Sequence, residues 1–235
     1  MIIEVLRKEQ QVPKGSSEGT CYLCNSTLSK GGMTRHLQSC LQREVVSEAP
    51  PGRKTKLLHL AIEGRYLPDY WMHLEAPADG TLDDLDDFLR DIWLECCGHL
   101  SAFTIGERTY FSHPGEDLGD EGMDVALGGV LRPGTRLQHE YDFGTSTYLT
   151  LRVLSEREAE TSSKSIEILA RNNPPLITCE MCAGIASLVC AACIWSGRGW
   201  VCEECAGEHE CGEEMLLPVV NSPRVGMCAY TGRRR

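Results

Sequence analysis

The chain has 235 residues, a mass of 26.0 kDa and a formal net charge of -11. This length suits one medium-sized core with smaller modules attached, and no run approaches the roughly eighteen apolar residues that a membrane-spanning helix needs. Residues 55–175 carry ten Lys or Arg against twenty-two Asp or Glu. This acidic middle repels phosphate backbones, so any nucleic-acid contact would come from the basic residues 1–54 or the arginines at 233–235.

A zinc signature in the order Cys, Cys, His, Cys lies near the start of the chain. The first two cysteines form a Cys-x2-Cys knuckle, which places two thiolates on one tight turn. The last two ligands are four residues apart in a predicted short helix, so they lie on one helix face. We therefore predict an amino-terminal zinc finger within residues 1–44. Its ligands are Cys21, Cys24, His36 and Cys40.

The helix of this finger carries Lys30, Arg35 and Arg43, which suggests contact with nucleic acid. Charges this sparse are more often a solvated face. A single finger also reads only about three base pairs. The expectation is therefore weak or absent nucleic-acid binding.

Residues 44–54 contain Pro-Pro-Gly and predict a linker. The following residues, 55–171, predict an α+β domain with a small, mostly antiparallel sheet and one main amphipathic helix. Apolar residues alternate at 58–62, and residues 71–75 suggest the hairpin partner. Apolar residues at three-four spacing over 82–93 predict the helix, with Thr81 and Asp84 as a capping box. Hairpins over 103–111 and 137–154 and a strand at 166–170 complete the domain.

Three features of this domain suggest chemistry but have simpler explanations. Cys96, Cys97 and His99 could form an activated thiol, but they follow an amphipathic helix, where core packing is the better interpretation. The acidic residues of the predicted helix, and those at 116–124, are expected to be solvated. The tripeptide at 142–144 also occurs in protein kinases, but no other kinase motif accompanies it.

A second cysteine array lies between residues 179 and 211, with three Cys-x2-Cys knuckles and enough ligands for two ions. Loop lengths favour cross-bracing, in which the first and third knuckles share one ion. Sequential pairing is the alternative, and Cys228 could replace Cys211. The favoured first set is Cys179, Cys182, Cys202 and Cys205. The favoured second set is Cys190, Cys193, His209 and Cys211.

The metal is expected to be structural zinc, about three ions per chain, in a carboxy-terminal module of residues 176–235. Four protein ligands close each site, whereas a catalytic zinc keeps one position for water. Disulfides are the competing explanation. The apolar run at 1–6 is too short for a signal peptide, so we expect a reducing, cytoplasmic location with free thiolates and no membrane association.

Ordered motifs over residues 55–155 resemble the plasmid pRiA ORF-three-like family. They are residues 74–77, the helix at 82–93, His99-Leu100-x-x-Phe103, and Tyr-Asp-Phe-Gly at 141–144. The carboxy-terminal part also resembles a sub-group with a cysteine array and Asn-Ser-Pro-Arg at 221–224. The resemblance implies a small α+β domain, often encoded on plasmids or near mobile elements, with no established activity.

The chain departs from the usual pattern of that family after the Tyr-Asp-Phe-Gly turn. Relatives continue with Asp, then Trp and His, whereas Thr145, Thr147 and Leu149 stand here. If those polar residues form a site in relatives, that site is expected to be lost in this chain.

Three functions compete on this basis. The favoured one is a zinc-binding, non-catalytic interaction protein, an adaptor with a protein partner, associated with plasmid or mobile-element biology. The alternative is a nucleic-acid-binding accessory protein that uses the basic finger. A hydrolase or nuclease is less favoured, because no Ser-His-Asp set, phosphate loop or open metal site stands out. The oligomeric state is not predicted.

Overall fold

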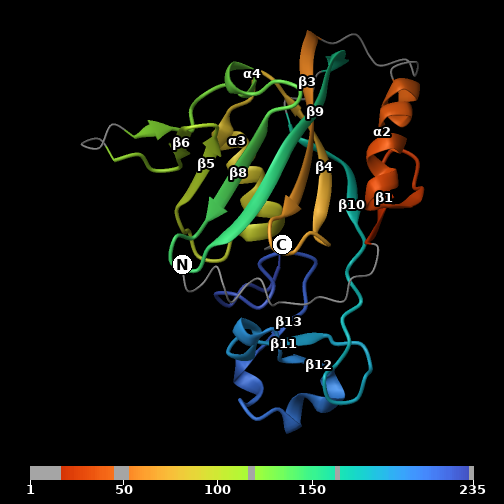
Figure 1. The fold of residues 1–235 in the computed structure, drawn as a ribbon, viewed down its shortest axis with the longest axis vertical. Coiled ribbons are helices and arrows are strands. Elements are labelled where there is room, and N and C mark those ends of the chain that lie inside the picture. Colours follow the sequence, from red (N-terminus) through yellow and green to blue (C-terminus); the bar gives the residue numbers. More distant parts are fainter. Residues whose placement is uncertain (1–16, 45–52, 116–119, 162–164, 233–235) are drawn as a thin grey trace.

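The computed structural model describes residues 17–44, 53–115, 120–161 and 165–232. Within them, ten strands form one sheet in the order β2-β1-β10-β4-β3-β9-β8-β5-β6-β7, antiparallel except for the pair β6 and β7 (Figure 1). The strands are β1 (Glu18–Cys21), β2 (Thr27–Ser29), β3 (Arg53–Gly64), β4 (Trp71–Pro77), β5 (Ser101–Ile105), β6 (Arg108–Phe111), β7 (Glu121–Gly122), β8 (Arg136–Tyr141), β9 (Thr147–Thr161) and β10 (Glu167–Asn172).

The predicted α+β class is confirmed, but the sheet is larger than the small one expected. The difference lies at its edges. The finger contributes β1 and β2, because β1 pairs with β10 from Gly19 to Cys21. At the other edge, β7 extends the hairpin of β5 and β6. Most of the predicted linker, residues 45–52, lies outside the described residues.

The long strands β3 and β9 form the centre of the sheet, and β4 lies beside β3. Every residue of β4 is buried, because both faces of this strand are covered. Met72 and Leu74 point into the main core with Leu60, whereas Trp71 packs in a second cluster with the finger. The alternation of side chains along a strand thus serves two different cores.

One face of the sheet is covered by helix α3 (Leu82–Leu89), which continues into a π-helical turn, η1 (Arg90–Leu94). The expected capping box is present: the Thr81 hydroxyl accepts a hydrogen bond from the Asp84 amide, and the Asp84 carboxylate accepts one from the Thr81 amide. The Glu95 amide donates to the Arg90 carbonyl five residues back, which widens the last turn. A short helix α4 (Leu127–Val130) follows later in the chain.

Asp86 was expected on the solvated face of this helix, but it is buried. Its carboxylate accepts a 2.7 Å hydrogen bond from the Ser101 hydroxyl and lies 2.6 Å from Nε2 of His139. Burial would raise the Asp86 pKa, but the hydrogen bond and charge of His139 lower it overall. All three side chains are almost fully enclosed, so this set ties α3 to the sheet and offers no reactive group to a substrate.

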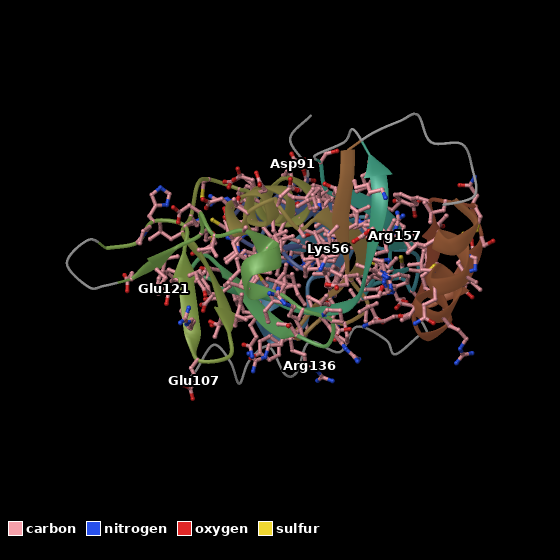
Figure 2. All side chains as sticks on the ribbon, turned by 90° about the horizontal axis from the view of Figure 1, so that it is seen from above. Lys56, Asp91, Glu107, Glu121, Arg136 and Arg157 are labelled. Carbon is pink, nitrogen blue, oxygen red and sulfur yellow. The ribbon has the colours of Figure 1, made fainter. Side chains whose placement is uncertain are left out.

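Charged side chains lie at the periphery of this part of the structure. Seen from above, Asp91 of η1, Glu107 between β5 and β6, and Arg136 of β8 lie toward the outside (Figure 2). Among the described residues, no helix has the length and apolar character that crossing a membrane requires.

The carboxy-terminal residues form a module beneath the end of the sheet (Figure 1). Its strands are β11 (Leu188–Cys190), β12 (Trp200–Val201) and β13 (Leu216–Pro218), and its 3-10 turns are η2 (Cys193–Ser196), η3 (Glu203–Glu208) and η4 (Glu213–Met215). The segment after β13 returns to the sheet, where Trp93 Nε1 donates to the Asn221 carbonyl and Ser222 Oγ donates to the Trp93 carbonyl. Val189 and Val225 join the main core. The division into domains 1–44, 55–171 and 176–235 stays a prediction.

Candidate metal centres

The first ligand set lies where the hairpin of β1 and β2 meets helix α2 (Lys30–Glu44). The structure brings the ligand atoms of Cys21, Cys24, His36 and Cys40 within 4.8 Å of one another. The Cys24 sulfur lies 3.2 Å from Nε2 of His36. Asn25, directly after the knuckle, has a φ of 59°, which turns the chain back into β2. His36 and Cys40, the two ligands on α2, thus lie next to the knuckle, which is the arrangement that the sequence predicts.

The finger is packed on the sheet rather than free. Met33 and Leu37 of α2 are fully buried against Trp71 and Leu169. Lys30 makes an ion pair with Glu63. These contacts fix the outward face of the helix, where Arg35 is exposed.

Two histidines are enclosed on the side of the sheet that the finger covers. Nε2 of His59 lies 3.0 Å from Nδ1 of His73, and the Thr34 hydroxyl of α2 lies 3.5 Å from Nε2 of His73. Burial lowers the pKa of His59 to about 4, with a smaller effect from the charge of Arg157. Burial, followed by the charges of His59 and Lys30, lowers the pKa of His73 to about 3. Both imidazoles are therefore neutral in the folded protein at neutral pH.

Acidification from pH 7 to pH 5 is expected to destabilise the fold through this pair. The unfolded histidines take up protons near their ordinary pKa of 6.5, whereas the folded ones do not, so stability is lost as the pH falls below that value. By pH 5 the loss approaches about 2 kcal/mol per histidine. Urea unfolding at fixed zinc should therefore depend less steeply on pH in a His59→Gln/His73→Gln variant. The exposed His113→Gln variant is the control, and equal pH slopes for wild type and the double variant would contradict the argument.

The carboxy-terminal array forms two further sets, and their members interleave along the chain. Cys179, Cys182, Cys202 and Cys205 form one set; Cys190, Cys193, His209 and Cys211 form the other. The Sγ atoms of Cys182 and Cys202 are 3.5 Å apart, and those of Cys193 and Cys211 are 3.6 Å apart. The first and third knuckles thus face one candidate site, which is the grouping that cross-bracing predicts. Which ligands share an ion stays a prediction.

Short elements hold these ligands at the ends of the small sheet. Cys190 ends β11, and Cys193 begins η2 three residues later. Gly199 has a φ of 93°, and a Cβ atom there would lie 2.7 Å from the Cβ of Cys193 and 2.9 Å from that of Cys190. Only glycine allows the chain to pass this close to the two cysteines.

The thiols of the first cross-braced set differ in acidity. Burial would raise the pKa of Cys179, but hydrogen bonds from the backbone of Met181 and Cys182 bring it to about 6. The pKa of Cys205 is raised, because its thiol shares hydrogen bonds with Cys202 and Cys182. The Cys179 thiolate therefore forms readily, whereas the Cys205 thiol resists ionisation. A bound cation would remove that conflict.

A fourth set was not predicted from the sequence. Cys96, Cys97, His99 and Cys228 also bring their ligand atoms within 4.8 Å of one another. The expectation that Cys96 and Cys97 serve core packing is wrong for Cys97, which is exposed, and Cys228 does not take the place of Cys211. With this set, all thirteen cysteines of the chain belong to four-ligand groups. The adjacent Cys-Cys-x-His and the leftover cysteine after the array were the available signals.

The surface of the cross-braced module carries both acidic and large apolar side chains. Six glutamates between residues 203 and 214 are exposed: Glu203, Glu204, Glu208, Glu210, Glu213 and Glu214. Around the first knuckle, Leu176 is 77% exposed, Ile185 is 65% exposed and Met181 is 45% exposed. Exposed large apolar side chains gathered on one structural element indicate contact with another protein.

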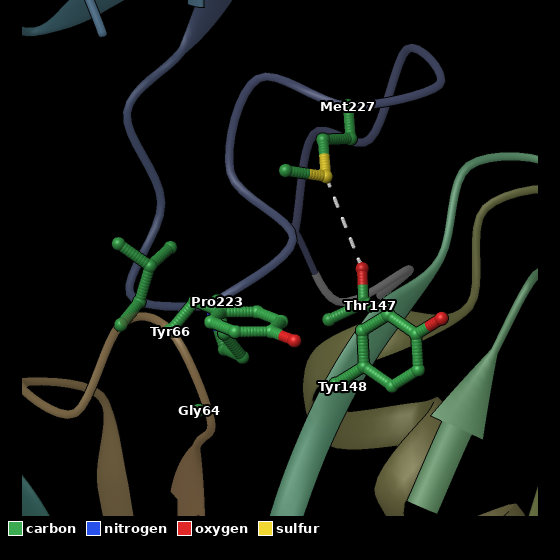
Figure 3. A pocket seen from close by; sticks show the side chains of 7 residues that line it. Gly64, Tyr66, Thr147, Tyr148, Pro223 and Met227 are labelled. Carbon is green, nitrogen blue, oxygen red and sulfur yellow. Dashed lines mark hydrogen bonds between the residues drawn. The ribbon is translucent and has the colours of Figure 1, made fainter. Parts of the chain in front are cut away.

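A small pocket lies between the end of β3, the start of β9 and the carboxy-terminal segment (Figure 3). Tyr66 and Tyr148 form one wall with their rings edge to face, and Thr147 donates a hydrogen bond to the Met227 sulfur across it. The pocket volume is about 10 Å³, room for about one water molecule. This pocket is too small for a substrate.

Comparison with known proteins identifies no family. No family model matches the chain, and no curated protein matches it. A crystal structure of a protein of unknown function, MM3350 from Methanosarcina mazei Go1, is similar to this chain with a TM-score of 0.43 and 15% sequence identity. The match covers 50% of this chain and 69% of MM3350. A similarity this weak carries no argument about function. The resemblance to the plasmid pRiA ORF-three-like family stays a prediction.

Proposed function

We propose that this protein is a non-catalytic interaction protein whose modules are held together by structural zinc. The observation that carries the proposal is the closure of each predicted ligand set: four protein side chains meet around one point and leave no position for a reacting water. Sets of thiolate and imidazole ligands select zinc over magnesium or calcium, which prefer oxygen. The sulfur separations of 3.5 and 3.6 Å fit a zinc tetrahedron, whose edge is about 3.8 Å for Zn–S bonds of about 2.3 Å.

The cross-braced module is the surface we assign to the partner. Its exposed glutamates flank ligands of both sets, and apolar Leu176, Met181 and Ile185 lie around the first knuckle. Apolar contact area supplies affinity, and an acidic rim selects a partner with basic residues. The partner is therefore proposed to be a protein with a basic rim around an apolar contact.

The nucleic-acid alternative has less support from this geometry. The outward face of α2 presents Arg35, but Lys30 is held by Glu63 and by the Pro68 carbonyl. Each phosphate contact adds nearly one unit to the slope of log affinity against log salt concentration. With so few basic side chains on this face, nucleic-acid binding is expected to be weak and salt-sensitive. The proposed association with plasmids or mobile elements rests on the sequence resemblance alone.

Replacing exposed glutamates of the cross-braced module by glutamine is expected to abolish partner binding. In a quantitative pull-down from native lysate treated with nuclease, wild type should retain a partner that Glu203→Gln/Glu204→Gln/Glu208→Gln/Glu210→Gln loses. The matched control neutralises four exposed acids elsewhere, Asp87→Asn, Asp91→Asn, Glu107→Gln and Glu121→Gln, and should keep the partner.

Two outcomes would count against this proposal. A partner that the nuclease removes would favour the nucleic-acid function, as would sub-micromolar, sequence-selective binding of purified protein to DNA at about 150 mM salt. Equal loss in both acid-neutralised variants would show that overall charge, and not the zinc module, recruits the partner.

A further inference from the structure

The fourth ligand set joins parts of the chain that are far apart in the sequence. Cys96, Cys97 and His99 follow the π-helical turn η1, whereas Cys228 lies in the segment after the cross-braced module. Nε2 of His99 lies 2.9 Å from the Cys97 sulfur and 3.3 Å from the Cys228 sulfur. The Cys97 sulfur lies 3.6 Å from that of Cys228 and 3.7 Å from that of Cys96. Four ligand atoms therefore surround one small volume.

These separations match those of the three predicted sets. The sulfur pairs of the cross-braced module are 3.5 and 3.6 Å apart, and a sulfur and a histidine nitrogen of the finger are 3.2 Å apart. A disulfide would instead hold its sulfurs at about 2.05 Å. The arrangement of the fourth set is thus that of a tetrahedral site with three thiolates and one imidazole.

The backbone at this set also resembles that of the knuckles. Gly98, directly after Cys97, has a φ of 79°. Asn25, directly after Cys24, and Ala183, directly after Cys182, also have a positive φ, 59° in each case. Cys228 itself has a φ of 47°, which is uncommon for a residue other than glycine. A strained conformation of this kind persists where surrounding contacts impose it. The sulfur of Cys228 lies within the ligand set in this conformation.

A buried arginine donates a hydrogen bond to one sulfur of the set. The Arg224 guanidinium is fully buried and its Nη2 donates to the Cys96 sulfur at 3.3 Å. The same nitrogen donates to the Asp142 carboxylate at 2.6 Å, and that carboxylate lies 3.5 Å from Nε2 of His99. Arg224 and Asp142 together are neutral, so the set is contacted by an ion pair, and the hydrogen bond from Arg224 favours the thiolate form of Cys96.

We propose that Cys96, Cys97, His99 and Cys228 bind a fourth zinc ion, which fastens the segment after the cross-braced module to the end of α3 and η1. The ion is structural, because protein side chains supply all four ligands. It adds a metal link to contacts already made there by Trp93, Asn221 and Ser222. The cross-braced module then has a fixed orientation on the sheet domain, whatever partner it binds.

Native mass spectrometry of the full chain, purified under reducing conditions, tests the proposal by counting ions. Wild type is expected to hold four zinc ions, and Cys228→Ser and Cys97→Ser to hold three each. Cys228→His keeps a ligand and should restore the fourth ion. Ala229→Ser is the matched control: it adds a hydroxyl at the neighbouring exposed position, where the backbone φ is 52°, and should hold four.

Hydrogen exchange gives a second readout in the same variants. Loss of the fourth ion should increase amide exchange in residues 224–230 and leave residues 179–211 unchanged. Three ions in wild type and three in Cys228→Ser would overturn the proposal, as would a disulfide between Cys97 and Cys228 mapped in the reduced preparation. These outcomes leave the structural-zinc function intact. One ion or none in wild type would instead refute the three zinc sites on which the proposed function rests.

Discussion

A strong chelator is expected to unfold the cross-braced module, residues 176–218, while the central sheet stays folded. The module has only three strands of two or three residues, and only a few of its large apolar side chains are buried. Structural zinc in small fingers contributes about 10 to 16 kcal/mol apparent at neutral pH, comparable with the roughly 5 to 15 kcal/mol net stability of a whole domain. Without its ions the module lacks the burial to compensate for the lost chain entropy.

Trypsin reports this unfolding at single positions. Arg198 is exposed inside the module, and Arg108 is exposed on the hairpin of β5 and β6, outside the module and outside every ligand set. Chelation should speed cleavage after Arg198 many-fold and leave cleavage after Arg108 slow. If cleavage rises at both sites together, Val189 and Val225 have made the module and the sheet one cooperative unit, and the predicted domain boundaries are wrong.

Matched cysteine variants show which ion holds which residues. Under cross-bracing, Cys179→Ser and Cys202→Ser remove the same ion, so the double variant should lose one ion in total. A Cys179→Ser/Cys190→Ser variant should lose two, because these residues belong to different sets. Sequential pairing would give the opposite results in the two double variants.

The parts of the structure that the sequence predicts are those that depend on neighbouring residues. The alternation at 58–62 and 71–75 predicts β3 and β4, because side chains in a strand alternate between faces. Thr81 and Asp84 predict the start of α3 because a capping box involves residues only three apart. The knuckle spacings predict the finger and the cross-braced sets for a similar reason, since loop length limits which thiols can meet.

The parts that the sequence does not predict depend on contacts between distant segments. Cys228 meets His99 across 129 positions, and no local pattern records that approach. Asp86 has the spacing of a solvated helix residue, but its burial follows from His139 on β8. The addition of β1 to the edge at β10 likewise depends on where the finger docks, and only the folded chain specifies that.

Replacing Arg224 is expected to give the largest loss of stability of any single charged residue argued above. Its side chain is fully buried, donates to Asp142 at 2.6 Å, and donates to the Thr145 carbonyl at 3.1 Å and the Thr147 hydroxyl at 3.0 Å. Arg224→Met keeps much of the apolar volume but leaves the Asp142 carboxylate without its partner. Removing one member of a buried ion pair costs about 3–5 kcal/mol. Urea unfolding followed by tryptophan fluorescence should show a loss of this size.

A double-mutant cycle separates the ion pair from the rest of the contact. Asp142 has a φ of 66°, a conformation that asparagine tolerates, and its Oδ1 accepts from the Gly144 and Thr145 amides, as an asparagine oxygen also can. Asp142→Asn combined with Arg224→Met should therefore be less destabilised than the two single changes added together, because no unpaired charge is buried. The control is Arg108→Met at an exposed ion pair, which should leave stability unchanged within error. Two outcomes would contradict the argument: strict additivity in the cycle, or a loss of stability under about 1 kcal/mol for Arg224→Met. Either would show that the Arg224 guanidinium contributes packing volume only, because burying the Asp142 carboxylate without its arginine destabilises the fold by more than this.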